Sequence, residues 1–372
     1  MRFLALTCAL LALSASGCNA RDDNAATWPF AVTEVARFDE PWDMAFLPDN
    51  TGALVTEKAG HLKWWTGTES RDIAGVPAVA YAEQGGFGDV ALAPDYATSG
   101  IVYLSWVEAG EGDLKGAVVG RAHLAFDGQP RLENLTVIWR QTKVTGEGYH
   151  YSHRLRFSPD GQYLFVTSGE RNKKTPAQDV TVNLGKVLRL TPDGRPAPGN
   201  PFAGQGGQAA EVWSYGHRNL YGLYFDKDGR LWENEMGPMG GDEVNLIEPG
   251  HNYGWPVVSN GSNYDGSDVP DHPTRPDFTA PKLWWNPSIS PSSLLIYDGS
   301  QFPQWQGDMF ITALSGQALV RVDLDGGNAT KAEQWEIGRL REVVQGPDGA
   351  LYILEDGAGD PGGRLLRLTP KT

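Results

Sequence analysis

One short pattern recurs six times along the chain and limits the folds that it can adopt. Each copy has an apolar segment, a turn resembling Pro-Asp-Gly and a second apolar segment. This is the pattern of a β-hairpin, because Pro presets the turn, Asp caps it and Gly tolerates positive φ. The six copies span residues 44–57, 90–106, 155–170, 223–235, 294–314 and 343–356.

The spacing of these hairpins predicts the architecture. The turn aspartates are separated by 46 to 70 residues, at Asp49, Asp95, Asp160, Asp228, Asp298 and Asp348. Each interval can hold a four-stranded blade and one loop, and a propeller leaves only short, protected strand edges. A β-sandwich would not space similar hairpins so widely. We therefore predict an all-β fold, a six-bladed β-propeller with four antiparallel strands per blade, in which an N-terminal strand completes the last blade.

The N-terminus has the pattern of an export signal. Arg2 precedes an apolar run at residues 3–13, far shorter than the roughly 20 residues that a membrane-spanning helix needs. The sequence Ala-Ser-Gly-Cys at 15–18 resembles a bacterial lipobox, which makes Cys18 the predicted lipidation site. Residues 1–17 are then a lipoprotein-type signal peptide, 18–35 a lipidated N-terminus and tether, and 36–372 the propeller domain. An ordinary signal peptide cleaved nearby is the alternative.

Export also fixes the expected location. Asn19, not Asp, follows the cysteine, and by resemblance to enterobacterial sorting this favours an outer-membrane lipoprotein on the periplasmic side. Only Cys8 and Cys18 are present, so the mature domain has no disulfide and no thiol chemistry. The formal net charge of −15 argues against nucleic acid or an anionic membrane surface as a partner.

The segment at residues 211–256 concentrates unusual chemistry. It contains a His-Arg-Asn tripeptide, a Gly-Pro corner, an acidic pair and an aromatic-Gly turn, a combination that is costly unless a ligand organises it. The segment resembles the soluble aldose sugar (glucose) dehydrogenases that depend on pyrroloquinoline quinone (PQQ). The similarity extends, with gaps, from about Pro41 to the C-terminus. Members of that family are six-bladed propellers that bind PQQ and calcium.

The resemblance implies an activity and two catalytic residues. An aldose would be oxidised at C1 to the lactone, with hydride passing to C5 of PQQ and electrons leaving to an external acceptor, a cytochrome or a quinone. His150 would remove the hydroxyl proton, a role that suits a pKa near 6.5. Arg218 would stabilise negative charge on the quinone oxygen. Relatives carry two glycines where Ser152 and His153 stand, so His153 is an alternative base.

PQQ bears three carboxylates, so its pocket needs fixed cations and amide donors. Residues two apart on a strand project to the same face, as the arginines of the Arg-Leu-Arg motif do. The family brings a Lys to PQQ from a loop that has Ser315 here, and this change predicts weaker binding. By resemblance, the cofactor-binding residues are Gln84, Arg218, Asn219, Ala313, Leu314, Ser315, Arg339, Leu340 and Arg341. Gly85 and Gly86 would let a loop approach the flat cofactor.

The resemblance also implies two calcium ions. Backbone carbonyls of Gly237 and Pro238 would ligate a calcium bound to PQQ, which would polarise the quinone. Glu243, through its carboxylate, and Tyr253, through its main-chain oxygen, would hold a second, structural calcium.

Two other functions remain open at this stage. Calcium-dependent lactonases and esterases are also propellers with a His base, and a non-catalytic propeller could bind a sugar or a cell-envelope partner. Ser315 and the Ser152–His153 pair favour the non-catalytic reading, whereas the motifs above favour the dehydrogenase. The expected partners are an aldose, an external electron acceptor and a membrane lipid anchor, for a monomer or a homodimer.

Overall fold

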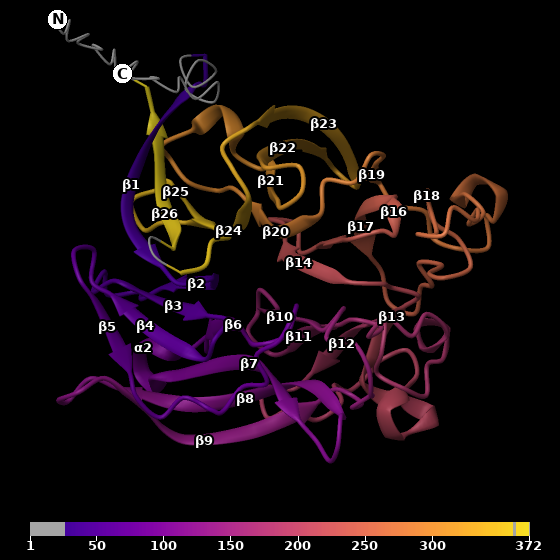
Figure 1. The fold of residues 1–372 in the computed structure, drawn as a ribbon, viewed down its shortest axis with the longest axis horizontal. Helices are drawn as coiled ribbons and strands as arrows, with labels where there is room; N and C mark the ends of the chain where they lie inside the picture. Colours follow the sequence, from indigo (N-terminus) through magenta and orange to yellow (C-terminus); the bar gives the residue numbers. More distant parts are fainter. Residues whose placement is uncertain (1–26, 360–361, 372) are drawn as a thin grey trace, which may run out of the picture.

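Six four-stranded antiparallel sheets stand in a ring (Figure 1). This architecture is that of a computed structural model, which describes residues 27–359 and 362–371. The first strands of neighbouring sheets contact one another all the way round, which closes the ring. The prediction of a six-bladed propeller with four strands per blade is confirmed.

The blades follow the order of the sequence. Blade 1 is β2 (Pro41–Phe46), β3 (Ala53–Glu57), β4 (His61–Trp65) and β5 (Ser70–Ile73); blade 2 is β6 (Phe87–Leu92), β7 (Ile101–Ala109), β8 (Lys115–Ala125) and β9 (Arg131–Arg140); blade 3 is β10 (Ser152–Phe157), β11 (Leu164–Ser168), β12 (Lys186–Leu190) and β13 (Val212–Tyr215). Blade 4 is β14 (Leu220–Phe225), β15 (Leu231–Glu235), β17 (Asp242–Ile247) and β19 (Leu283–Trp285); blade 5 is β20 (Pro291–Ile296), β21 (Met309–Ala313), β22 (Ala318–Asp325) and β23 (Asn328–Trp335); blade 6 is β24 (Leu340–Gln345), β25 (Leu351–Glu355), β26 (Gly363–Pro370) and β1 (Phe30–Phe38).

The remaining elements are short. β16 (Met239–Gly240) and β18 (Gly261–Ser262) form a separate two-stranded sheet, and the helical turns are α2 (Tyr96–Ser99), η1 (Thr175–Gln178), η2 (Ala203–Gln205), η3 (Gly207–Glu211), η4 (His272–Thr274) and η5 (Pro303–Trp305). No helix in the described part of the chain has the length and apolar character needed to cross a membrane.

The N-terminal strand closes the ring as expected. β1 pairs antiparallel with β26, placing Phe30 opposite Pro370, so the two ends of the chain complete blade 6 together (Figure 1). The strand starts at Phe30, before the boundary at residue 36 that the sequence suggested. It is an outer strand with exposed polar residues such as Thr33 and Glu34, and its pattern is therefore close to that of a tether. Cys18 and the signal segment lie outside the described residues.

The apolar core lies between the blades. Strand side chains alternate between the two faces of a sheet, and here both faces of each blade are covered by a neighbour. In β3, for example, Leu54 packs with residues of blade 2, while Ala53 and Val55 pack with residues of blade 6. This explains why the second strands are apolar at successive positions instead of alternating with polar residues.

A buried ionic cluster ties four blades together at the centre. The Arg154 guanidinium lies 2.9 Å from Asp43, 3.3 Å from Asp89 and 2.7 Å from Glu342. These four residues come from β10, β2, β6 and β24. Burial raises the pKa of Glu342 to about 8 against the opposing attraction of Arg154.

The direction of the strands decides where functional groups can gather. Because the first and second strands of each blade are antiparallel, the start of the first strand and the end of the second lie at the same end of the ring. We call this end the site mouth. The hairpin turns with the six aspartates lie at the opposite end. Predicted functional residues before β6, β10, β14 and β24, and after β15 and β21, therefore share the site mouth.

Candidate active site

A cavity of about 320 Å³ opens at the site mouth. Four of the predicted cofactor-binding residues line it, namely Gln84, Leu314, Arg339 and Arg341. A larger cavity of about 440 Å³ lies at the hairpin end, between residues such as Phe46, Phe157 and Tyr224. That cavity contains none of the predicted site residues, so the smaller one is the candidate binding site.

His150 is held beside this cavity by Gln84 and Glu170. Its backbone N–H donates to Gln84 Oε1 (2.8 Å), and its Nδ1 lies 2.5 Å from Glu170 Oε1. The Glu170 backbone N–H in turn donates to the Arg218 carbonyl (3.0 Å). The structure therefore brings together Gln84, His150 and Arg218, which precede the first strands of three different blades.

The environment of His150 favours its neutral form. Burial lowers the pKa of His150, and the guanidinium groups of Arg218 and Arg171 lower it further, while the hydrogen bond to Glu170 opposes this. Burial raises the pKa of Glu170, but the interactions with His150, the Lys174 backbone N–H and the Arg218 charge together hold this pKa below its usual value. With Nδ1 donating to an ionised Glu170, Nε2 carries a lone pair and can accept a proton.

His153 is not placed to compete for this role. Its ring is 2% exposed, stacks on Trp42 with centroids 5.3 Å apart, and its Nδ1 lies 2.8 Å from Ser105 Oγ. Burial, followed by the nearby Arg154 charge, lowers the pKa of His153 to about 3. Of the two histidines that the sequence left open, the geometry favours His150 as the base.

Gly86, two residues after Gln84, allows a close contact between two backbone segments. A Cβ on Gly86, whose φ is 138°, would lie 2.3 Å from the carbonyl oxygen of Lys58. The close approach that Gly86 permits is therefore to blade 1, and not to the space that a cofactor would occupy.

Arg218 and Asn219 sit directly before β14. Arg218 is 5% exposed. Its Nη1 donates to the Met236 carbonyl (2.9 Å) and its Nη2 lies 3.3 Å from the Tyr264 hydroxyl, whereas its buried Nε has no partner among the described residues. Asn219 is fully buried and accepts from Ser152 Oγ at 3.2 Å. An unpartnered N–H on a buried guanidinium is costly, and an anionic ligand or water would relieve it.

Arg339 and Arg341 converge on one carboxylate. Arg339 Nε lies 2.5 Å from Asp356 Oδ2, and Arg341 Nη2 lies 2.9 Å from Asp356 Oδ1. Arg341 Nη1 also donates to Ser292 Oγ at 3.4 Å. The two arginines thus meet at one carboxylate, although Arg339 precedes β24 and is not part of the strand. Leu340 between them is fully buried in the core and does not line the cavity.

The segment at 313–315 contributes unequally to the cavity. Ala313 ends β21 and is fully buried, while Leu314 lines the cavity. Ser315 is exposed, and its Oγ lies 2.8 Å from Oγ of Ser290, itself a lining residue.

Asp242 organises the Gly-Pro corner. Its Oδ1 accepts from the Gly237 N–H (2.9 Å), and its Oδ2 accepts from the N–H groups of Ile289 and Ser290, both at 2.7 Å. A Cβ on Gly237 would lie 2.3 Å from the carbonyl oxygens of Gly240 and Gly241. Only glycine fits this tight corner, which also carries the carbonyl of Pro238.

Glu243 and Tyr253 meet at a small cavity behind that corner, which Glu235 and Gly237 also line. Burial raises the pKa of Glu243, and a hydrogen bond with His272 opposes this. No Lys or Arg side chain forms an ion pair with Glu235 or Glu243 among the described residues.

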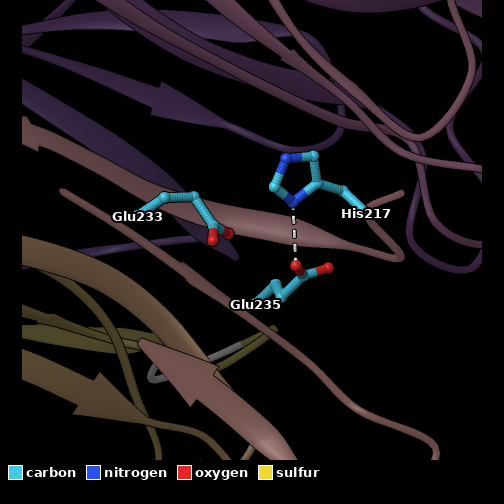
Figure 2. A group of neighbouring side chains, drawn as sticks. All are labelled: His217, Glu233 and Glu235. Carbon is cyan, nitrogen blue, oxygen red and sulfur yellow. Dashed lines mark hydrogen bonds and ion pairs between the residues drawn. The ribbon is translucent and has the colours of Figure 1, made fainter. Parts of the chain in front are cut away.

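An acidic group continues from this small cavity into blade 4. Figure 2 shows Glu233, Glu235 and His217, whose candidate ligand atoms lie within 4.8 Å of one another. His217 Nδ1 lies 2.9 Å from Glu235 Oε1, and its Nε2 lies 2.8 Å from Ser214 Oγ. Both imidazole nitrogens are engaged, so His217 orients Glu235 instead of offering a free lone pair.

The donor atoms fit a hard cation. Within the described part of the chain, the buried oxygens Glu233 Oε1 and Asn245 Oδ1 have no hydrogen-bond partner. Asn245 Nδ2 lies within 3.4 Å of carboxylate oxygens of Glu233, Glu235 and Glu243. Buried carboxylates without a basic partner are strongly destabilising unless they bind protons or a cation. Carboxylate and carbonyl oxygens are the ligands that calcium prefers.

The cavity at the site mouth fits an anionic cofactor. The described residues that line it include three cations (Lys58, Arg339 and Arg341) and three carboxylates (Glu40, Glu83 and Asp356). Asp356 orients the two arginines, and Arg218 lies beside the cavity with an N–H that has no partner among the described residues. Fixed guanidinium groups suit planar carboxylates.

Several residues of the site were not singled out from the sequence. Glu170, Glu235 and Asp356 each follow or end the second strand of a blade, where they meet His150, His217 and the Arg339–Arg341 pair. Each is also the last residue of one recurring hairpin pattern, so an acid at that position was a readable signal. Trp42, Tyr221 and Met236 line the cavity without such a signal.

A propeller whose mouth joins a cation-lined cavity to a carboxylate-held imidazole is suited to a quinone-dependent oxidoreductase. The sequence model of the Glucose / Sorbosone dehydrogenase family matches residues 38–367, and the chain belongs to that family. Aldose sugar dehydrogenase YliI of Escherichia coli is 38% identical over 345 residues, covering 90% of this chain and 91% of that protein. The chain is thus a PQQ-dependent oxidoreductase of the soluble sugar dehydrogenase family.

Solved structures agree with this assignment. The apo-form of soluble aldose sugar dehydrogenase from Escherichia coli superposes with a TM-score of 0.85 at 36% identity, covering 92% of this chain and 100% of that one. The PQQ-bound form of aldose sugar dehydrogenase from Streptomyces coelicolor gives a TM-score of 0.74 at 29% identity, covering 92% and 98%.

Proposed function

We propose that the protein oxidises aldose sugars at C1 to lactones, with His150 as the proton acceptor and Arg218 as the electrostatic partner of the cofactor. The observation that carries the proposal is the His150–Glu170 pair, in which Nδ1 and Oε1 lie 2.5 Å apart. The Glu170 backbone N–H also donates a hydrogen bond to the Arg218 carbonyl, which links the pair to Arg218. A neutral imidazole beside a cationic, partly buried guanidinium can take a proton from a hydroxyl while negative charge develops nearby.

The other residues of the site would bind the cofactor, support His150 and exclude water. PQQ, when bound, supplies the acceptor for the hydride that leaves the sugar. Arg339 and Arg341 would hold its carboxylates, and Gln84 and Asn219 would present amide groups. Leu314 and Ser315 would border the cofactor, with the buried Ala313 and Leu340 supporting the loop and the arginines from behind. Glu170 fixes the proton of the neutral His150 ring on Nδ1, and burial favours that neutral ring, so Nε2 is free to accept a proton when the sugar binds. Since Leu314 and Tyr221 line the cavity, part of its wall is apolar and excludes water.

We also assign two calcium sites in this proposal. The carbonyls of Gly237 and Pro238 form one beside the cofactor, and Glu243 with the Tyr253 carbonyl forms the other. Support for the second comes from the unpartnered buried oxygens beside Glu235 and Glu243. The first would polarise the quinone as a Lewis acid, and the second would stabilise blade 4 by neutralising its buried acids.

The cellular setting is proposed from the sequence alone. An exported lipoprotein attached through Cys18 at the outer membrane would meet sugars in the periplasm. The reduced cofactor would then pass electrons to an external cytochrome or quinone. The chain would work as a monomer or a homodimer.

The test uses purified protein freed of metal and supplied with PQQ and calcium. We expect dye reduction with glucose and other aldoses that requires PQQ, and we expect His150→Ala to lose at least about a hundredfold of the turnover while still binding PQQ. His153→Ala is the control, with turnover retained. Lactone hydrolysis without PQQ would instead identify a lactonase, and folded protein with neither activity would identify a binding module.

A further inference from the structure

Lys58 is a third cation of the cavity that the proposed function leaves unassigned. It follows β3 in blade 1, and its side chain is only 11% exposed. It lines the same cavity as Arg339 and Arg341, which belong to the neighbouring blade 6. A lysine this deep in a cavity is unusual, because its long side chain normally keeps the ammonium group in water.

The backbone of Lys58 is fixed from two sides. Its N–H donates to the Glu40 carbonyl (3.0 Å), and its carbonyl accepts from the Phe87 N–H (2.9 Å). The absence of a side chain on Gly86 allows this contact, since a Cβ there would lie 2.3 Å from the Lys58 oxygen. The base of the side chain is therefore held at the junction of blades 1, 2 and 6.

The ammonium group is held loosely compared with the two arginines. Lys58 Nζ donates to Glu40 Oε1 at 3.3 Å and to the Glu83 carbonyl at 3.2 Å, whereas Arg339 and Arg341 contact Asp356 at 2.5 and 2.9 Å. The other Glu40 oxygen is engaged by the Tyr81 hydroxyl. An ammonium has three N–H donors, so two long bonds leave one donor for a ligand.

The charges of the cavity explain why a third cation matters. Its described lining holds Lys58, Arg339 and Arg341 against the carboxylates of Glu40, Glu83 and Asp356. The positive charges are thus balanced before any anion enters. Asp356 uses both oxygens on the arginines, but Glu40 divides its carboxylate between Lys58 and Tyr81. Lys58 is consequently the cation that a carboxylate ligand can recruit with the smallest loss of existing contacts.

We propose that Lys58 binds a carboxylate of the PQQ cofactor, as a third cationic contact beside Arg339 and Arg341. This inference rests on the proposed function, because it takes PQQ as the ligand of the cavity. Lys58 would act on cofactor affinity and not on proton transfer, which belongs to His150. A competing, purely structural role would be to clamp Glu40 to the loop at Glu83.

The experiment measures PQQ binding to metal-loaded protein without sugar, by calorimetry, at low and high ionic strength. We expect Lys58→Met to weaken the Kd by about tenfold or more, since a hydrogen bond between charged groups is lost. We also expect a shallower dependence of the Kd on salt, because one ion contact is missing, and near wild-type binding in Lys58→Arg. Lys227→Met is the matched control: it removes the same charge from an exposed turn, where Lys227 pairs with Asp228.

Melting temperatures of the same variants distinguish binding from folding. Suppose that Lys58→Met has a lower melting temperature but binds PQQ with the wild-type Kd and salt dependence. This result would overturn the inference and show that Lys58 only holds Glu40 to the loop at Glu83. If Lys58→Met does not fold, Lys58→Gln is measured in its place and the same Kd comparison decides. Wild-type protein that takes up no PQQ would overturn the proposed function and this inference together, whereas unchanged binding in the Lys58 variants alone overturns only the inference.

Discussion

His150 Nδ1 and Glu170 Oε1 lie 2.5 Å apart, across the gap between the start of β10 and the end of β11. This pair fixes which imidazole nitrogen is available, because an ionised carboxylate accepts the Nδ1 proton and leaves the lone pair on Nε2. The hydrogen bond with Glu170 also raises the pKa of His150, whereas burial lowers it. The base of the proposed reaction is therefore a two-residue unit.

The first prediction tests that unit. In Glu170→Gln the negative charge is lost, so the pKa of His150 falls further below its usual value and the imidazole becomes a weaker base. We expect kcat to fall about tenfold to a hundredfold, in the range of partners that orient a functional histidine. The acid limb of the kcat/KM profile should move to lower pH.

The double variant supplies the control. If the two residues act as one unit, adding Glu170→Gln to His150→Ala should change kcat little, because effects within a unit are not additive. A full additional loss in the double variant, or an acid limb that stays in place in the single one, would assign Glu170 to another role.

Much of the fold was predictable because its signal is local. Each recurring pattern contains its own turn, as at Asp160 and Asp348, and a hairpin needs no information from elsewhere in the chain. The end of the ring that carries the site followed from the same patterns, since His150 and Arg218 both precede a first strand. The predicted domain boundary at residue 36 falls inside β1, which starts at Phe30, because a half-exposed outer strand has a mixed pattern.

The pairings within the site depend on contacts between distant segments, and the sequence does not encode them locally. Arg341 and Asp356 are joined only after β24 and β25 pair. His150 and His153 are three residues apart but differ in role, because His153 stacks on Trp42 from another blade. No spacing rule distinguishes two such histidines. Glu170 was readable as a strand-ending acid, but its partner was not.

The second prediction concerns stability at low pH and involves His153. In the unfolded chain its pKa is near 6.5, and in the folded protein burial lowers the pKa to about 3. Below pH 6.5 the unfolded state therefore binds a proton that the folded state does not, and stability falls as the pH falls. His153→Phe keeps a ring against Trp42 but cannot titrate.

The measurement is the free energy of unfolding in urea at pH 7 and pH 5. Between these values the wild type should lose about 2 kcal/mol more than His153→Phe. His150, whose pKa is also lowered, contributes equally to both proteins and cancels. Parallel pH dependences in the two proteins would show that His153 does not titrate as the structure implies.

The third prediction concerns the calcium proposed at Glu243 and Tyr253. In protein without PQQ, a chelator should lower the melting temperature of the wild type, since the bound ion stabilises only the folded state. At calcium a hundredfold above its Kd the stabilisation is about 2.7 kcal/mol, which corresponds to roughly 4 °C for a chain of this size. Glu243→Gln should melt at the same temperature with and without chelator.

A matched variant separates this effect from general loss of negative charge. Glu69→Gln removes one charge from a side chain that is 65% exposed and pairs with Arg71, and it should respond to chelator as the wild type does. An equal response in Glu243→Gln would exclude Glu243 as a ligand.

The fourth prediction ranks the two arginines that Asp356 holds. Arg341 has a side chain only 8% exposed, whereas Arg339 is 50% exposed, so solvent screens Arg339 more strongly. Arg341→Met should weaken PQQ binding at least about tenfold and Arg339→Met only a few-fold. Removing Arg341 also leaves Asp356, whose side chain is 13% exposed, with Arg339 as its single cation, and this loss destabilises the folded protein. Adding Asp356→Asn to Arg341→Met should therefore restore much of the lost melting temperature without restoring PQQ affinity. Recovery of both properties in the double variant would mean that Arg341 serves only to neutralise Asp356.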